Sequence, residues 1–216
     1  MTQYSNTPTL QYSFFYSLFL FALALVPLSA SSQQSYGRID IRCLKSNNVI
    51  TFKTADTNVS IGYAATRNEN PRATIVAQKL VSTNWCAVTL QFAIGQNDTV
   101  TLILRGRYRE TEPTGEMVPD WVWVDNVSLM DTNGAELCRN GSFEKVQQTL
   151  VKLFRDGQPQ KWGYKGSGRE IKYDPAGACP QDGERCLKVW HSLAATQSFL
   201  LRSNLWYTMR AYFRAE

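Results

Sequence analysis

The feature that most restricts the fold of this chain is a succession of short segments rich in β-branched and aromatic residues. Turn-forming stretches such as GQND and DTNG separate these segments at intervals close to ten residues. In VTLQFAI, the side chains of Val88, Leu90, Phe92 and Ile94 would share one face of an extended strand. Because this spacing and alternation are typical of β-sandwiches, we expect an all-β fold.

The first part of the chain has the character of a targeting segment. Residues 1–37 contain no charged side chain, and residues 14–28 form a continuous apolar run that small residues follow near Ala30. This pattern predicts a signal peptide over residues 1–32, with an uncleaved membrane anchor as the alternative. We therefore expect a secreted, extracellular protein that has no membrane contact after cleavage.

The charges argue against one class of partner. Lys and Arg exceed Asp and Glu by five, but they are scattered among the acids and form no run. Since nucleic-acid grooves usually carry a clustered basic patch, we expect no nucleic acid as partner. An anionic glycan stays open as a partner.

The cysteine content agrees with the secretion that the apolar N-terminal run predicts. The chain has five, and export to an oxidising compartment favours disulfides. Cys179 and Cys186 flank the turn-rich stretch PQDGER and could close a short loop, although spacing does not fix the pairing. A zinc site is not expected, because there is no CxxC pattern and only one histidine, His191.

A four-residue motif, RCLK, occurs twice, at residues 42–45 and 185–188. Each copy is followed by a tyrosine-containing segment that reads as a strand, NVSIGYAATRNE in the first half and NLWYTMRAYFRAE in the second. We interpret the two copies as parts of a repeated unit.

Several other motifs belong together. They are NGSFE at 140–144, a tryptophan loop at 162–163, GERCLKV at 183–189, YTMRAYFRAE at 207–216, NWCAVTLQF at 84–92 and WVWVDNVSL at 121–129. As a set they resemble carbohydrate-binding modules of the galactose-binding-like jelly-roll superfamily, the type that accompanies cellulases and xylanases. The resemblance implies a jelly-roll β-sandwich and a secreted, non-catalytic protein that binds a polysaccharide or another glycan.

The motifs stand in an unusual order, which allows two domain organisations. In the first, residues 37–134 are a nearly complete jelly-roll module lacking its opening strand, and residues 137–216 are the front half of a second module. In the other, the two halves complete one permuted sandwich. We favour the first organisation, because the duplicated RCLK segment would be redundant in a single domain. The chain would then act alone or as the front fragment of a larger glycan-active protein.

Aromatic residues are the first candidates for the binding site, because their faces stack on the apolar face of a sugar ring. Candidates in a glycine-rich loop are Trp162, Tyr164 and Tyr173, and candidates flanking the second RCLK strand are Trp190 and Trp206. Core packing is an equal alternative for Trp162 and Tyr164, and it is the favoured reading for Trp190 and Trp206. For Trp85, Trp121 and Trp123 we expect core positions.

The resemblance also implies a structural calcium ion. In such modules a glutamate of the opening strand and an aspartate of the closing strand contribute oxygens, and the matching residues here are Glu144 and Asp125. Hard oxygen ligands of this kind suit Ca²⁺. Ordinary solvated or turn-forming carboxylates are the alternative.

Nothing in the sequence predicts catalysis. A glycosidase needs two carboxylates aimed at one bond, and no such pair is recognisable. The expected function is therefore non-catalytic carbohydrate binding. The alternative from another class is an extracellular structural or adhesive β-sandwich that binds protein partners.

Overall fold

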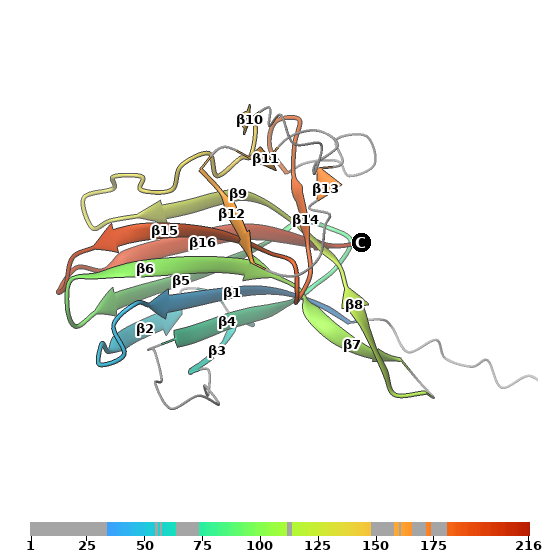
Figure 1. Cartoon of the computed structure of the whole chain (residues 1–216), viewed down its shortest axis with the longest axis horizontal. Helices are drawn as coiled ribbons and strands as arrows, with labels where there is room; N and C mark the ends of the chain where they lie inside the picture. The colour runs from blue at the N-terminus through green and yellow to red at the C-terminus, as the bar shows by residue number, and fades with distance from the viewer. Residues whose placement is uncertain are drawn as a thin grey trace, which may run out of the picture. The chain divides into compact units, whose positions relative to one another are not determined.

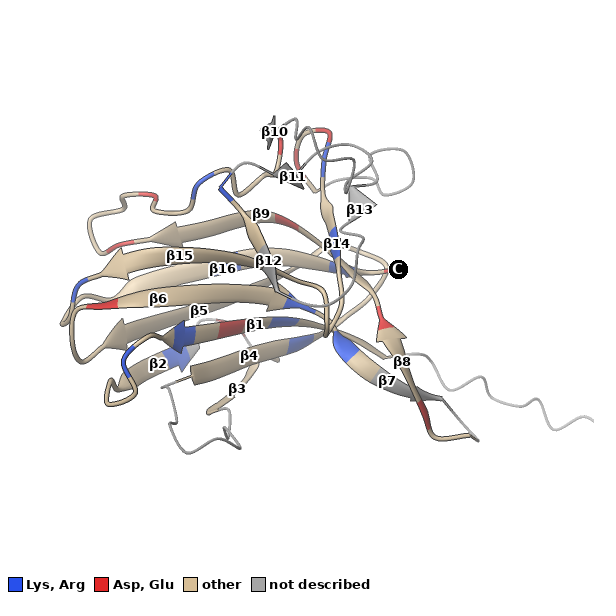
Figure 2. Cartoon of the chain, viewed as in Figure 1, with Lys and Arg blue, Asp and Glu red and all other residues tan. Residues whose placement is uncertain are grey.

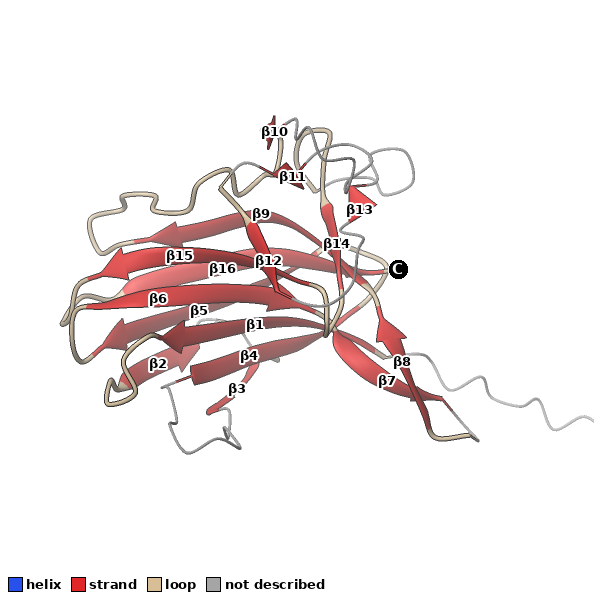
Figure 3. Ribbon diagram, viewed as in Figure 1, coloured by secondary structure: helices blue, strands red, loops and turns tan. Residues whose placement is uncertain are grey.

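The computed structural model describes residues 34–54, 56, 58–63, 74–111, 114–147, 158–159, 161–165, 172–173 and 181–216. Residues 34–216 belong to one compact unit. The described residues form strands and no helix, which confirms the all-β prediction (Figure 3). Accordingly, none of them lies in a helix that could cross a membrane. The predicted signal peptide, residues 1–32, lies outside the described residues.

Two six-stranded antiparallel sheets make up a β-sandwich (Figure 1). The first sheet contains, in spatial order, β12 (Gly163–Lys165), β15 (Ala194–Leu201), β6 (Asp98–Arg105), β1 (Ser35–Cys43), β4 (Thr74–Val81) and β3 (Ser60–Tyr63). The second sheet contains β13 (Lys172–Tyr173), β14 (Leu187–Val189), β9 (Val122–Met130), β16 (Tyr207–Ala215), β5 (Cys86–Ile94) and β2 (Ile50–Thr54). Two small hairpins lie outside these sheets, β7 (Arg107–Thr111) with β8 (Glu116–Asp120) and β10 (Val146–Gln147) with β11 (Gln158–Pro159).

The core lies between the sheets, where the alternating apolar side chains meet. The predicted inward face of β5 is confirmed, since Val88, Leu90, Phe92 and Ile94 are all buried. The sheets approach closely where β1 crosses β16. A Cβ atom on Gly37 would lie 2.4 Å from the Phe213 ring, so only glycine fits this contact.

Strands from the two halves of the chain pair with each other in both sheets. In the first sheet β15 pairs with β6, from Ala195 opposite Leu104 to Leu201 opposite Asp98. In the second sheet β16 lies between β9 and β5. The halves therefore share one core, as in the single-sandwich alternative, and not the tandem arrangement of 37–134 and 137–216 that we favoured.

The two RCLK copies occupy different positions in this sandwich. The first spans the end of β1, near the centre of the first sheet, whereas the second leads into β14 near an edge of the second sheet. The tyrosine strands that follow are likewise the edge strand β3 and the central strand β16. The similar sequences thus occupy different structural positions, and the structure gives no support to a repeated unit.

The cysteines are described in part. No disulfide joins Cys43, Cys86 or Cys138 to another described residue. Burial, followed by the nearby carboxylates, raises the pKa of the Cys43 and Cys138 thiols to about 12. Cys179 lies outside the described residues, so its pairing with Cys186 stays a prediction.

Candidate functional site: a groove on the second sheet

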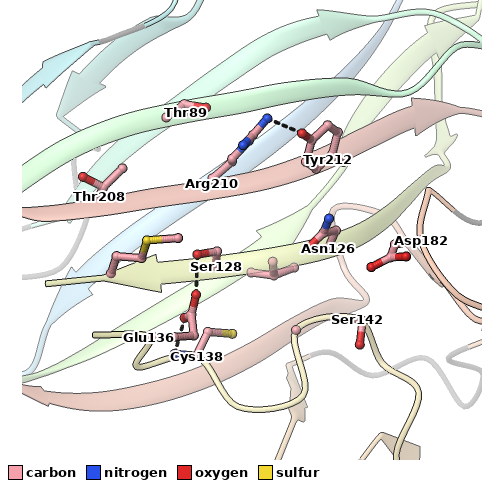
Figure 4. A pocket seen from close by; sticks show the side chains of 13 residues that line it. Thr89, Asn126, Ser128, Glu136, Cys138, Ser142, Asp182, Thr208, Arg210 and Tyr212 are labelled. Atoms are coloured by element: carbon pink, nitrogen blue, oxygen red, sulfur yellow. Dashed lines mark hydrogen bonds between the residues drawn. The ribbon is translucent and has the colours of Figure 1, made fainter. Parts of the chain in front are cut away.

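The outer face of the second sheet carries a groove of about 550 Å³ (Figure 4). Its floor comes from β5, β16 and β9, where Thr89, Arg210 and Ser128 stand opposite one another across three strands. Further lining comes from Glu136, Cys138, Gly141, Ser142 and Asp182. The volume lies within the range of 300–1,000 Å³ that is usual for small-molecule sites.

The alternation of β16 explains the polar floor. Tyr207, Met209, Ala211 and Phe213 turn inward and are buried, so the intervening side chains must face outward. Those that line the groove are Thr208, Arg210 and Tyr212. Because every second side chain of β16 is buried in the core, the side chains between them face outward. They give the groove floor a hydroxyl, a guanidinium group and an aromatic ring.

Arg210 and Tyr212 form one unit within the floor. The guanidinium carbon of Arg210 lies 4.7 Å from the centre of the Tyr212 ring, and the guanidinium group donates a hydrogen bond to the phenol oxygen. Figure 4 shows both side chains rising from β16. This contact fixes a flat aromatic face and a forked donor beside each other.

A β-bulge shapes the floor next to Tyr212. The pairing of β16 with β9 shifts register between Arg210 and Tyr212. On β9, Asn126 adopts a positive φ of 45°, a conformation in which asparagine is tolerated better than most residues. Its side-chain amide donates to Gln181 Oε1 at 2.9 Å. Bulges of this kind redirect side chains next to functional sites.

Glu136 fastens the wall to the floor. Its Oε1 atom accepts hydrogen bonds from the backbone N–H groups of Leu129 (2.9 Å) and Cys138 (2.7 Å), and its Oε2 atom accepts one from Ser128 Oγ. Because three donors occupy this carboxylate, it acts as a structural bracket.

The motif NGSFE forms the next part of the wall. The carbonyl of Gly141 accepts a hydrogen bond from Val127 N at 2.9 Å. A Cβ atom on Gly141 would lie 1.8 Å from the Val127 carbonyl oxygen, so the approach requires glycine. Phe143 enters the core, whereas Ser142 lines the groove.

Asp125 and Glu144 hold one loop from two sides. Asp125 Oδ2 accepts hydrogen bonds from the backbone N–H groups of Gln181 (2.9 Å) and Asp182 (3.1 Å). Glu144 Oε1 accepts from the N–H groups of Glu184 and Arg185, each at 2.9 Å. The two residues expected to meet at a calcium ion therefore do meet at the same loop, and they place Asp182 at the groove.

The donor set around this loop does not fit calcium. Ca²⁺ requires six to eight oxygen ligands, whereas the atoms that face Asp125 Oδ2 and Glu144 Oε1 are backbone N–H donors. Moreover, no group of three or more His, Cys, Asp or Glu side chains within the described part of the chain could hold a metal ion.

Burial sets the charge state of Asp125. The side chain is fully buried, and this burial raises its pKa to about 6, with a smaller rise from the Glu144 carboxylate. The N–H groups of Asp182, Asn126 and Gln181 act in the opposite direction. The loop is therefore tied to a carboxyl group that titrates in the mildly acidic range.

The aromatic residues predicted from sequence lie elsewhere. Trp162 is buried, with its ring centre 5.2 Å from that of Phe143 and its Nε1–H bonded to the Asn140 carbonyl at 2.9 Å, so it takes the core alternative. Trp190 is half-buried against Trp121, with ring centres 5.8 Å apart. Trp206 is half-buried beneath the Lys53 ammonium group, 4.5 Å from its ring centre.

The other predicted aromatics are described only in their backbones. Tyr164 belongs to β12 and Tyr173 to β13, and their side chains lie outside the described part. Trp123, expected in the core, is buried with Cys186 in a small hydrophobic cluster separate from the main core, and the Lys188 ammonium group lies 5.3 Å from its ring centre.

The groove residues themselves were missed from sequence. The available signal was the alternation in YTMRAYFRA, where polar and aromatic side chains fill every second position. That pattern marks an outward face but does not reveal which strands lie beside it.

Comparison with known proteins assigns no relative. No family model matches the chain, and no curated protein or solved structure matches it either.

Proposed function

We propose that this chain is a secreted, non-catalytic β-sandwich protein of the galactose-binding-like jelly-roll type, which binds a polysaccharide in the groove. The motif set and the two packed antiparallel sheets support the fold type. The polar and aromatic lining of the groove supports a polysaccharide as the ligand.

One observation carries the proposal. The outward row of β16 presents Arg210 and the ring of Tyr212 side by side, with Thr208 and Ser128 nearby. A pyranose offers an apolar C–H face for the ring and hydroxyl groups for hydroxyl and guanidinium partners. Such a mixed lining is better matched to a polyhydroxylated ligand than to an apolar one.

The carboxylates favour binding over hydrolysis. Glycoside hydrolysis requires two carboxyl groups that are free to act on one bond. Of the two carboxylates that line the groove, Glu136 is occupied by three hydrogen-bond donors. We therefore assign no acid–base pair, and calcium has no part in the proposal.

Affinity electrophoresis of the chain on a panel of soluble polysaccharides tests this function. We expect at least one polysaccharide to retard the protein and Tyr212→Ala to weaken that retardation roughly tenfold, because a lost stacking anchor costs more than about 1 kcal/mol. Tyr212→Phe keeps the ring and serves as the matched control, with most of the affinity retained.

Three results would contradict the proposal. If no polysaccharide retards the protein, or if Tyr212→Ala behaves as wild type, the groove is not a glycan site, and the extracellular adhesive alternative becomes the better account. If the protein releases reducing sugars from the same panel, it is an enzyme.

A further inference from the structure

The outer face of the first sheet carries an unusual cluster of arginines. On β1, Arg38, Asp40 and Arg42 occupy alternate positions and therefore share one face. On β6, Arg105 stands directly opposite Arg38. Figure 2 shows this blue and red sequence along β1, with further blue at the adjoining ends of β6 and β7.

Asp40 neutralises only part of this charge. Its carboxylate is 1% exposed and binds two arginines, Arg38 through Nε at 2.7 Å and Arg105 through a terminal nitrogen. Arg42 makes no ion pair with any described residue. Two guanidinium groups thus share a single carboxylate and a third stands without one, so the three arginines and one acid of the cluster keep an excess of two positive charges.

Buried nitrogen atoms without partners occur in two of these arginines and in the histidine near Arg105. Among the described residues, four buried side-chain nitrogen atoms lack a hydrogen-bond partner, and three of them are Arg42 Nε, Arg105 Nε and His191 Nδ1. Buried polar atoms are normally paired, so these nitrogen atoms are available to a hydrogen-bond acceptor. Two of these three atoms belong to guanidinium groups, which donate and never accept hydrogen bonds.

His191 reports the field of the cluster. It lies in the turn between β14 and β15, with its ring centre 4.3 Å from that of Tyr108. Burial, and then the charges of Arg105 and Arg38, lower its pKa, whereas Asp40 acts weakly in the opposite direction. The histidine is therefore neutral at neutral pH and sits at the rim of a positive potential.

Solutes can reach the cluster. The side chains of Arg38 and Arg105 remain 20% and 17% exposed, and Arg42 is only half-buried. Planar guanidinium groups bind carboxylate and phosphate oxygens through paired N–H donors, and they carry a weaker hydration shell than an ammonium group.

We propose that Arg38, Arg42 and Arg105 form a binding site for an oxyanion, a carboxylate, sulfate or phosphate group, on the sheet opposite the groove. The anion accepts hydrogen bonds from donors that Asp40 leaves unused. The proposal does not depend on polysaccharide binding in the groove.

Because His191 is the only histidine, its ring proton is a site-specific NMR probe. Sodium sulfate, phosphate and galacturonate are titrated separately against the full chain at neutral pH, with sodium chloride at matched ionic strength as reference. We expect a saturable shift of the His191 signal with at least one oxyanion. The three arms identify which anion chemistry the site prefers.

Two variants of equal charge change complete the test. Arg42→Gln should weaken the response roughly tenfold or more, because it removes the arginine that has no ion pair while leaving the Asp40 pairs intact. Arg202→Gln removes an exposed arginine after β15 and should leave the response unchanged. A shift no larger than that of chloride, or an Arg42→Gln titration equal to wild type, overturns the proposal.

Discussion

The outward strand positions of the two sheets make a useful comparison. On the second sheet, β16 presents Thr208, Arg210 and Tyr212, and loop segments rise beside them to make a groove. On the first sheet, β1 presents an acid between two arginines. Both faces follow from the same inward alternation, so the core fixes where outward side chains stand and leaves their chemistry free.

The faces also differ in what holds them. The groove wall depends on backbone approaches and carboxylate brackets, whereas the arginine face depends on one buried carboxylate, Asp40. Substitutions at these anchors should therefore affect one face and spare the other.

The largest effect is expected for Asp40→Asn. Removing one partner of a buried ion pair leaves the other charges unpaired, so we expect the free energy of unfolding to fall by about 3 kcal/mol. Urea denaturation measures the change, and Glu184→Gln, an exposed acid, is the charge-matched control. A loss equal to that of the control would show that Asp40 does not anchor this face.

A smaller effect is expected for Gly141→Ala. The added methyl group would collide with the Val127 carbonyl, so the wall must shift, at a cost of about 1–3 kcal/mol. Polysaccharide retardation should fall, while the His191 response to oxyanions should remain. Gly62→Ala is the control, because nothing lies within 4 Å of a Cβ atom there. If the retardation of Gly141→Ala equals that of wild type, the groove wall does not contribute to polysaccharide binding.

The smallest effect is a pH dependence from Asp125. Its pKa is about 6 in the folded chain against an ordinary 3.8, so the folded state binds the proton more tightly between these values. Acidification from neutral pH to about pH 5 should therefore stabilise wild type by about 1 kcal/mol relative to Asp125→Asn. Urea denaturation at both pH values gives the difference, and parallel curves for the two proteins would refute the assignment.

Sequence reasoning recovered the strands better than the site. The alternation in VTLQFAI identified a buried face, because side-chain period is a local property. The groove combines residues near 89, 126 and 208. The local sequence pattern does not predict which of these distant segments pair with one another. Trp162 was predicted as a ligand-binding residue but lies in the core. Its indole N–H donates a hydrogen bond to the Asn140 carbonyl, which allows the ring to be buried.

The position of β16 has a consequence for how the molecule is made. It is the last described strand in chain order, yet it lies between β9 and β5 near the middle of its sheet. During translation β5 and β9 are therefore made before the strand that lies between them. Until β16 is made, their facing edges have no partner, and Val88, Leu90 and Val124 are still uncovered. Closure of this sheet must wait until β16 leaves the ribosome, so the earlier strands are prone to aggregate until then.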